Sequence, residues 1–435
     1  MNLIKSTGTF SFFTLISRIS GYLRDILIAI YLGAGPISDA FFVAFRIPNT
    51  FRRLFSEGTF NAAFVPSYKT EINRGKMVGE KFANGVFNIL IISLLTIVFL
   101  IEIFMPLFVT IIAPGFKGSP EKLDLAISLT RITFPFLFLV SLSSFFSAIL
   151  NTHNKFAAAS ATPIILNIIL ILVLFFGKVL EDKLVYYISY AVTFAGLVQL
   201  IFLIFFVKKY FIPKISFKFN YNGKIKLFFN KLFPSIFSSG VTQINILIGT
   251  IIASFQANAV SYLYYADRIY QINLAVAGIA IGTVLLPNLS KYVDTKNISK
   301  IKLIQNKSLE LSLFLSLPAT AALLVASKEI TSALFGYGSF DELSVHNTSL
   351  ALFYFALGMP AFAFIKVFSS FLFARHNTKI PFYFSLFSVL VNISISIYFF
   401  SIIGFIIIPI ATTIASWINS LLLLFYIMKK NYFSF

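Results

Sequence analysis

The chain has 435 residues, of which 58% are hydrophobic and 12% are charged, and its mean hydropathy of +0.88 excludes a soluble protein. The net charge of +19 would indicate nucleic-acid binding in a soluble protein. In a membrane protein, loop lysines that fix the topology explain this charge, so we expect no nucleic-acid partner. Cysteine is absent, which excludes disulfides, thiol nucleophiles and cysteine-ligated metals.

Apolar runs along the chain predict about twelve membrane-spanning helices, so the expected fold class is an all-α polytopic membrane protein. In chain order these runs cover residues 9–32, 37–66, 82–112, 122–150, 156–177, 184–207, 232–256, 260–290, 305–326, 342–373, 380–402 and 404–428. The N-terminus shows no small-residue cleavage site after a short apolar core. We therefore expect the first helix to act as its own signal anchor.

Basic residues gather in every second loop of this predicted order. The basic loops include residues 69–81, 208–231 and 291–302, whereas the loops at 33–38 and 257–259 carry no charge. Because basic loops stay on the cytoplasmic side of a membrane, this bias predicts that both termini are cytoplasmic.

The second half of the sequence weakly repeats the first at a spacing of about 220–226 residues. The clearest match joins the segments 143–155 and 369–379, with chance similarity in a Phe- and Ser-rich sequence as the alternative. Six spans in each half would give both halves the same orientation, as in rocking transporters. We predict an N-terminal lobe of residues 1–212 and a C-terminal lobe of residues 213–435, related by a parallel repeat around a central cavity.

Five arginines and three carboxylates fall within two of the predicted spans. They are Arg18, Arg24, Asp25, Asp39, Arg46, Arg52, Arg53 and Glu57. A charge at mid-membrane costs about 2.5–3.5 kcal/mol even on lenient insertion scales, so these side chains must face one another or a water-filled cavity. Arginine suits a planar anion such as phosphate or carboxylate, which it binds with two parallel hydrogen bonds. The segment indicates an anion-binding cavity.

Pairing among these charges remains an alternative to ligand binding. On a helix, Arg18 and Asp25 share a face while Arg24 points about 120° away, which favours the wall of a cavity over a single ion pair. The alternative is a structural pair between Asp25 and either arginine. Arg53 and Glu57 lie four residues apart and are expected to neutralise each other, which leaves Arg52 for substrate. Pro48 is expected to bend the helix between them.

The C-terminal half contains one acid–base pair deep in a predicted span, Asp267-Arg268. We expect Arg268 to contact substrate, and the alternative is a plain ion pair with Asp267. The remaining charges within spans are expected near the membrane interfaces or locally paired; they are Glu102, Arg131, Glu310 and Lys366. No histidine cluster or Gly-rich phosphate loop occurs, so we predict no catalytic residue, no bound metal and no cofactor.

The motifs of the first 70 residues resemble the opening signature of the MurJ/MviN family of lipid II flippases. The matching residues are Ser17-Arg18, Gly21, Arg24-Asp25, Asp39-Ala40-Phe41-Phe42, Pro48-Asn49, Arg52-Arg53-Leu54-Phe55, Glu57-Gly58, Phe60 and Ala63-Phe64-Val65-Pro66. Later matches are Ala113-Pro114-Gly115-Phe116, Arg131 with Phe134-Pro135, Ala148-Ile149-Leu150-Asn151 and Ala266-Asp267-Arg268. The resemblance runs from the N-terminus to about residue 428.

The resemblance implies a transporter of the bacterial inner membrane that moves the undecaprenyl-diphosphate-linked peptidoglycan precursor, lipid II, from the cytoplasmic to the periplasmic leaflet by alternating access. The implied partners are lipid II, membrane lipids and the cell-wall synthesis machinery. The residues that the family uses for headgroup binding or gating correspond to Arg18, Arg24, Asp25, Asp39, Asn49, Arg52, Glu57 and Arg268.

Two departures from the family pattern shape the remaining expectations. The family has fourteen spans, of which the last two form a groove for the lipid tail, whereas this sequence shows about twelve. Some members place a sodium ion among carboxylates of the second lobe, but no Asp or Glu lies between Lys183 and Ala266 or after Glu342, so sodium coupling is not expected. The alternative functions are export of another polyprenyl-linked oligosaccharide, export of drugs within the same superfamily, and a scaffold without transport.

Overall fold

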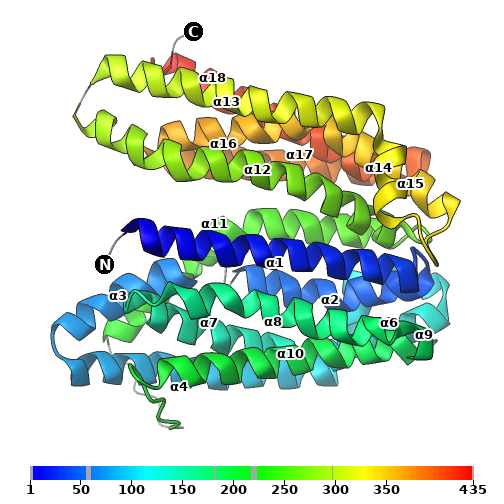
Figure 1. Ribbon diagram of the computed structural model, residues 1–435, viewed down its shortest axis with the longest axis horizontal. Coiled ribbons are helices and arrows are strands. Elements are labelled where there is room, and N and C mark those ends of the chain that lie inside the picture. Colours follow the sequence, from blue (N-terminus) through cyan, green and yellow to red (C-terminus); the bar gives the residue numbers. More distant parts are fainter. Residues whose placement is uncertain (1–2, 55–59, 181–182, 217–222, 296, 434–435) are drawn as a thin grey trace. The chain divides into compact units, whose positions relative to one another are not determined.

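The computed structural model describes residues 3–54, 60–180, 183–216, 223–295 and 297–433 (Figure 1). Every regular element in these ranges is a helix, as the apolar runs predict. Long apolar helices are the expected result, because backbone groups inside a membrane must find their hydrogen-bond partners within the chain.

The first helices are α1 (Leu3–Leu32), α2 (Pro36–Leu54), α3 (Phe60–Asn73), α4 (Lys76–Ile103), α5 (Met105–Ile112), α6 (Pro120–Thr133), α7 (Phe136–Thr152), α8 (Phe156–Phe175), α9 (Gly177–Leu180) and α10 (Leu184–Val207). They are followed by α11 (Gly223–Ala253), α12 (Ala259–Asp294), α13 (Ile298–Val325), α14 (Ser327–Phe335), α15 (Glu342–Ala356), α16 (Met359–Phe373), α17 (Lys379–Ile403) and α18 (Ile407–Lys429). Short 3-10 turns cover Pro114–Gly118 and Gly404–Ile406.

The predicted spans follow this order, with two kinds of difference: some spans are broken into two helices, and α14 (Ser327–Phe335) lies between the spans predicted at 305–326 and 342–373. The span predicted at 37–66 is divided between α2 and α3, and the one at 122–150 is divided between α6 and α7 at Phe134 and Pro135. Among the described residues, seven helical segments are long and apolar enough to cross a membrane. The last of these, Lys379–Lys429, contains both α17 and α18.

The chain forms two compact units, unit 1 (Met1–Gln243) and unit 2 (Ile244–Phe435), and the division falls inside α11. The predicted lobe boundary at residues 212 and 213 would instead assign the whole of α11 to the second lobe, and it stays a prediction. Contacts explain why the start of α11 belongs to unit 1: Lys224 pairs with Glu71 of α3 at 2.5 Å, and Phe228 packs in a phenylalanine-rich core with Phe60 and Phe64.

The helices of unit 2 repeat the packing order of unit 1. In unit 1, α10 packs against α6, α7 and α8; in unit 2, α18 packs correspondingly against α15, α16 and α17 (Figure 1). One hydrogen bond recurs at matching places: the Thr193 hydroxyl of α10 donates to the Ile132 carbonyl at 2.5 Å, and the Thr413 hydroxyl of α18 donates to the Tyr354 carbonyl at 2.7 Å. This is the parallel repeat that the sequence predicts.

One aromatic pair follows α10 and another follows α18; we call these pairs, Tyr210–Phe211 and Tyr432–Phe433, the terminal latches. Phe211 is buried and its ring lies 5.9 Å from that of Phe145 in α7. Phe433 is likewise buried, with its ring 5.9 Å from that of Phe371 in α16. The two contacts occupy equivalent positions of the repeat.

The tyrosines of the two latches contact the residues that follow α7 and α16. The Tyr210 ring stacks on His153 at 4.6 Å, and the Arg375 guanidinium lies 4.5 Å from the centre of the Tyr432 ring. Burial lowers the pKa of the His153 imidazole below its ordinary value, and the charge of Lys69 lowers it further. Both effects favour the neutral form of the His153 imidazole in this latch.

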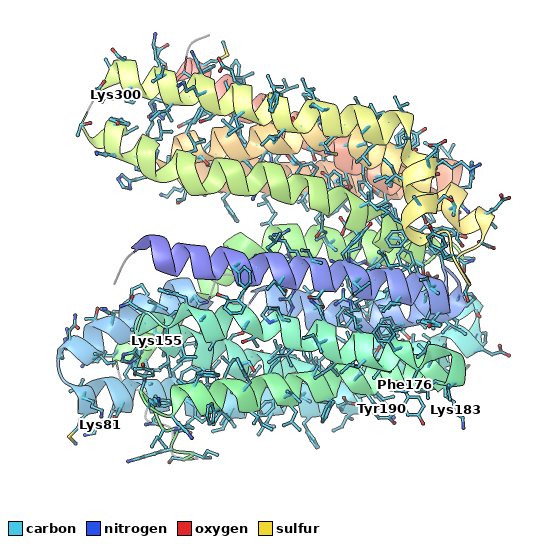
Figure 2. The ribbon with its side chains drawn as sticks, viewed as in Figure 1. Lys81, Lys155, Phe176, Lys183, Tyr190 and Lys300 are labelled. Carbon is cyan, nitrogen blue, oxygen red and sulfur yellow. The ribbon has the colours of Figure 1, made fainter. Side chains whose placement is uncertain are left out.

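Charged side chains mark the two ends of unit 1. Figure 2 shows Lys81 and Lys155 at one end of this unit, and Lys183 with Phe176 and Tyr190 at the other. Lys81 lies in the basic loop 69–81, and Lys155 lies in the next loop on the same side of the predicted order. Lys183 lies in the intervening-side loop 178–183, whose two basic and two acidic residues sum to zero charge. The two loop sets therefore lie at opposite ends of the unit, as spans that cross a membrane alternately require.

Candidate functional site

The first cluster of buried charge joins α1 to α8. Arg24 Nε and Nη2 donate to Asp25 Oδ1 at 3.0 and 2.6 Å, and Arg24 Nη1 donates to Asn167 Oδ1 of α8 at 3.0 Å. Only 5% of Arg24 and 1% of Asp25 is exposed. Asn167 Nδ2 donates in turn to the Ser17 carbonyl at 2.9 Å. A Cβ at Gly21 would lie 3.3 Å from Asn167 Nδ2, so a glycine here lets α8 approach closely.

The pairing of Arg24 with Asp25 is the alternative that the sequence left open, and the structure shows it. The two side chains leave the helix in different directions, but the long arginine side chain reaches back to its neighbour. Three of the five N–H groups of the guanidinium are used in these bonds, so two N–H groups remain for other acceptors.

A second buried pair joins α2 to α6. Asp39 is fully buried in the first turn of α2, where the positive end of the helix dipole favours a carboxylate. Lys122 Nζ, in the first turn of α6, lies 2.5 Å from Asp39 Oδ2 and 4.1 Å from the centre of the Phe116 ring. A lysine at the start of a helix is disfavoured by the same dipole, so Asp39 and Phe116 together stabilise Lys122 in this position.

The second half of α2 carries two of the predicted residues side by side. Arg52 Nε donates to Asn49 Oδ1 at 3.0 Å, and both side chains are half-buried, as is Arg46. Arg18 of α1 is exposed. Glu57 lies outside the described residues, so its expected pairing with Arg53 remains a prediction.

The predicted residue of unit 2, Arg268, lies near the start of α12. Its Nη2 donates to the Tyr264 hydroxyl at 2.9 Å, and its guanidinium lies 4.7 Å from the centre of the Tyr264 ring. The neighbouring Asp267 accepts a hydrogen bond from Gln271. Both members of the Asp267-Arg268 pair are half-buried, and the two hydrogen bonds join each of them to a side chain one turn away along α12.

The remaining predicted charges lie toward the surface of the units. Arg131, Glu310 and Lys366 are exposed, and Glu102 is half-buried. Within the part of the chain that the structure describes, no group of three His, Asp or Glu residues could hold a metal ion.

Contacts place the predicted site residues in three groups within their units: Arg24 with Asp25, Asn49 with Arg52, and Asp39 by itself with Lys122. Sequence reasoning missed Lys122, because it stands at the first residue of a predicted span where a charge looks ordinary. It also missed Asn167, because a neutral amide within an apolar span gives no charge signal in the sequence. From Leu3 to Leu54, α1 and α2 contain six basic and two acidic residues, so this region is positively charged.

Comparison with known proteins decides the family. A family model described as "Lipid II flippase MurJ" matches residues 28–435. A Rickettsia prowazekii (strain Madrid E) protein named "Probable lipid II flippase MurJ" is 38% identical over 433 residues, covering 99% of this chain and 85% of that protein. A Rhizobium meliloti (strain 1021) protein of the same name is 41% identical over 97% of this chain and 80% of its own length. The chain belongs to the lipid II flippase MurJ family.

Solved structures agree with this assignment to the MurJ family. A structure named "Lipid II flippase MurJ, inward closed conformation" matches 97% of this chain and 88% of its own chain, with a TM-score of 0.87 and 30% identity. An inward-facing MATE family transporter of the MOP superfamily matches with a TM-score of 0.74 and 13% identity, which shows a shared fold alone. The predicted all-α, two-lobe transporter fold is confirmed, and the protein is a multi-pass membrane transporter and not an enzyme.

Proposed function

We propose that the chain is a lipid II flippase of the bacterial inner membrane, which moves the undecaprenyl-diphosphate-linked peptidoglycan precursor from the cytoplasmic to the periplasmic leaflet by alternating access. The observation that carries this proposal is the match to the MurJ inward-closed structure over 97% of the chain with a TM-score of 0.87. Relatives at 38% and 41% identity carry the same flippase name.

The proposed headgroup-binding residues are Arg18, Arg24, Asp25, Asp39, Asn49, Arg52, Glu57 and Arg268. The chemistry of the four arginines among them fits the substrate, because a diphosphate and peptide carboxylates are anions that a guanidinium binds with two parallel hydrogen bonds. The excess of basic residues in α1 and α2 supports an anionic ligand. The two N–H groups of Arg24 that remain after its bonds to Asp25 and Asn167 are suited to a phosphate oxygen.

The roles of the residues differ in this proposal. Asp25 and Asn167 orient the Arg24 guanidinium, and Asn49 orients that of Arg52 through its bond to Nε. Asp39 acts through the placement of α2, since its carboxylate faces Lys122. Outward movement is favoured by an inside-negative membrane potential, by about 2.3 kcal/mol per negative charge and 100 mV.

The proposed orientation places both termini in the cytoplasm, because the basic loops lie at the end of unit 1 that carries Lys81 and Lys155 (Figure 2). The absence of native cysteine makes single-cysteine labelling clean. Lys183→Cys should react with an impermeant maleimide added outside, and Lys155→Cys should react only after the membrane is opened. Reaction of both from outside would contradict the orientation.

Growth of a flippase-depleted host tests the proposed function directly. The chain should restore growth to cells depleted of their own lipid II flippase, and it should restore the exposure of lipid II on the periplasmic leaflet. Normal membrane levels without growth and without lipid II exposure would refute the proposal. Exposure of a different polyprenyl-linked oligosaccharide in the same cells would identify the alternative exporter function.

A further inference from the structure

Helix α2 contains a carbonyl that its own helix cannot satisfy. In an α-helix the N–H of each residue donates to the carbonyl four residues earlier, and proline has no N–H. Pro48 lies inside α2, so the carbonyl of Ala44 lacks its usual helical donor. Ala44 is fully buried, and a buried backbone group inside a membrane protein requires a partner from elsewhere in the protein.

Helix α6 supplies that partner. The Thr133 hydroxyl, in the last turn of α6, donates to the Ala44 carbonyl at 3.0 Å, and it also lies 3.3 Å from the Thr130 carbonyl of its own helix. Thr133 is fully buried, so bulk water does not reach this bond. A side chain far away in the sequence therefore repairs the interruption that Pro48 makes in α2.

The same helix holds α2 at a second point. Lys122, in the first turn of α6, pairs with Asp39 in the first turn of α2 at 2.5 Å. The half of α2 that precedes Pro48 is thus fixed to α6 near its start by charge and near its end by the Thr133 hydroxyl. The residues after Pro48, including Asn49 and Arg52, continue from this fixed half.

The fixed half of α2 also bears on the buried arginine of α1. The Arg24 guanidinium lies 5.7 Å from the centre of the Phe45 ring, and Phe45 stacks on Phe41 at 5.8 Å. Phe45 directly follows Ala44, whose carbonyl binds Thr133. A shift of α2 at this turn would move the aromatic face beneath Arg24 and, beyond Pro48, the Asn49–Arg52 pair.

We infer that Thr133 and Lys122 are positioning residues of the proposed headgroup site, which hold α2 so that Arg24, Asn49 and Arg52 keep their places. The inference rests on the proposed function, because it concerns how those side chains meet an anionic lipid headgroup. Neither residue touches the substrate in this account. Thr133 acts through the Ala44 carbonyl, and Lys122 acts through Asp39.

The decisive experiment compares two threonines of one helix. Thr133→Val removes the hydroxyl that reaches α2, whereas Thr130→Val removes a buried hydroxyl that bonds only within α6, to the Ala126 carbonyl at 2.6 Å. The purified full-length variants are assayed for lipid II affinity in nanodiscs and for thermal unfolding. We expect Thr133→Val to bind lipid II about tenfold more weakly, and both Thr130→Val and Thr133→Ser to stay within about twofold of the parent.

A second background separates positioning from a general loss of packing. Pro48→Ala restores an N–H at position 48 and gives the Ala44 carbonyl its helical donor. In that background, Thr133→Val should change lipid II affinity by less than about twofold relative to Pro48→Ala alone. If Thr133→Val alone fails to insert, the double variant Pro48→Ala with Thr133→Val should recover membrane insertion.

The outcomes distinguish this inference from the proposed function. If the parent chain binds lipid II and restores growth but Thr133→Val behaves like Thr130→Val, the positioning role is refuted and the flippase proposal stands. An equal loss from Thr133→Val in both backgrounds, or failure of the double variant to insert, also refutes it. If the parent chain neither binds lipid II nor restores growth, the proposed function itself fails.

Discussion

The two units repeat one helix order but fill their interiors with different chemistry. Among the residues whose burial is described, the buried charged side chains all belong to unit 1; they are Arg24, Asp25, Asp39, Glu71 and Lys122. The buried polar side chains of unit 2 in the same set are all hydroxyls and amides. The two copies of the repeat therefore share a helix order but differ in the buried polar side chains that they contain.

Two asparagines, Asn167 and Asn392, lie 225 residues apart, which matches the spacing of the repeat, and they make the contrast specific. Asn167 of α8 accepts a hydrogen bond from the Arg24 guanidinium at 3.0 Å. Asn392 of α17 instead joins a neutral network, in which it donates to the Thr412 hydroxyl and accepts from Ser396, both at 3.1 Å. Buried charged side chains add little net stability to a fold, but they can bind a charged ligand. Neutral polar side chains are sufficient to join helices within a membrane. Unit 1 is thus the more specialised half.

The largest effect is expected from arginine-to-lysine changes at the proposed site. Lysine offers one point charge and cannot reproduce the three bonds that Arg24 makes to Asp25 and Asn167. Arg24→Lys and Arg268→Lys should reach the membrane normally yet fail to restore growth of flippase-depleted cells. The control Lys366→Ala, at an exposed position, should support growth. Growth with both lysine variants would show that these arginines serve only as counter-charges.

The next effect concerns the stability of unit 1. Lys122→Met removes the ammonium that lies 2.5 Å from the buried Asp39 carboxylate, and breaking such a pair costs about 3–5 kcal/mol. The double variant Asp39→Leu with Lys122→Met should regain most of this free energy of unfolding, because neither charge of this pair remains. Denaturation in detergent micelles measures both, and equal stabilities of the single and double variants would contradict the expectation.

A smaller difference should separate the two equivalent asparagines. Asn167→Ala removes a bond to a charged group, which contributes about 1.5–3 kcal/mol, whereas Asn392→Ala removes neutral bonds of about 1 kcal/mol. Thermal unfolding of the two variants under one condition gives the ranking. A larger loss for Asn392→Ala would mean that the neutral network of unit 2 is the more important of the two.

The smallest expected effect is that of sodium. The sequence has no Asp or Glu after Glu342, and Asn392, Ser396 and Thr412 satisfy one another with neutral hydrogen bonds. A cation prefers carboxylate oxygens in such a place. Replacement of sodium by potassium should therefore leave lipid II flipping in proteoliposomes unchanged at fixed membrane potential. A steep sodium dependence would overturn this expectation.

The spans and the repeat were predictable because apolar runs and loop lysines are local signals in the sequence. The partners of buried charges were not, because they come from distant elements: Lys122 lies 83 residues from Asp39, and Asn167 lies 143 residues from Arg24. Helical geometry also misled the interpretation of Arg24 and Asp25, since side-chain length outweighs the angle between neighbouring positions. Nothing in the sequence pattern connects Thr133 with Pro48, because the bond is made to a backbone carbonyl.

The terminal latches have a consequence for protein engineering. Since Phe211 anchors the segment after α10 and Phe433 anchors the segment after α18, a cut between Ser216 and Gly223 leaves both anchors intact. Two separately expressed fragments, cut there, should reassemble in the membrane through the Lys224–Glu71 pair and the aromatic contacts of Phe228. Such a split transporter would allow either half to be exchanged, labelled or supplied on demand while the other stays unaltered.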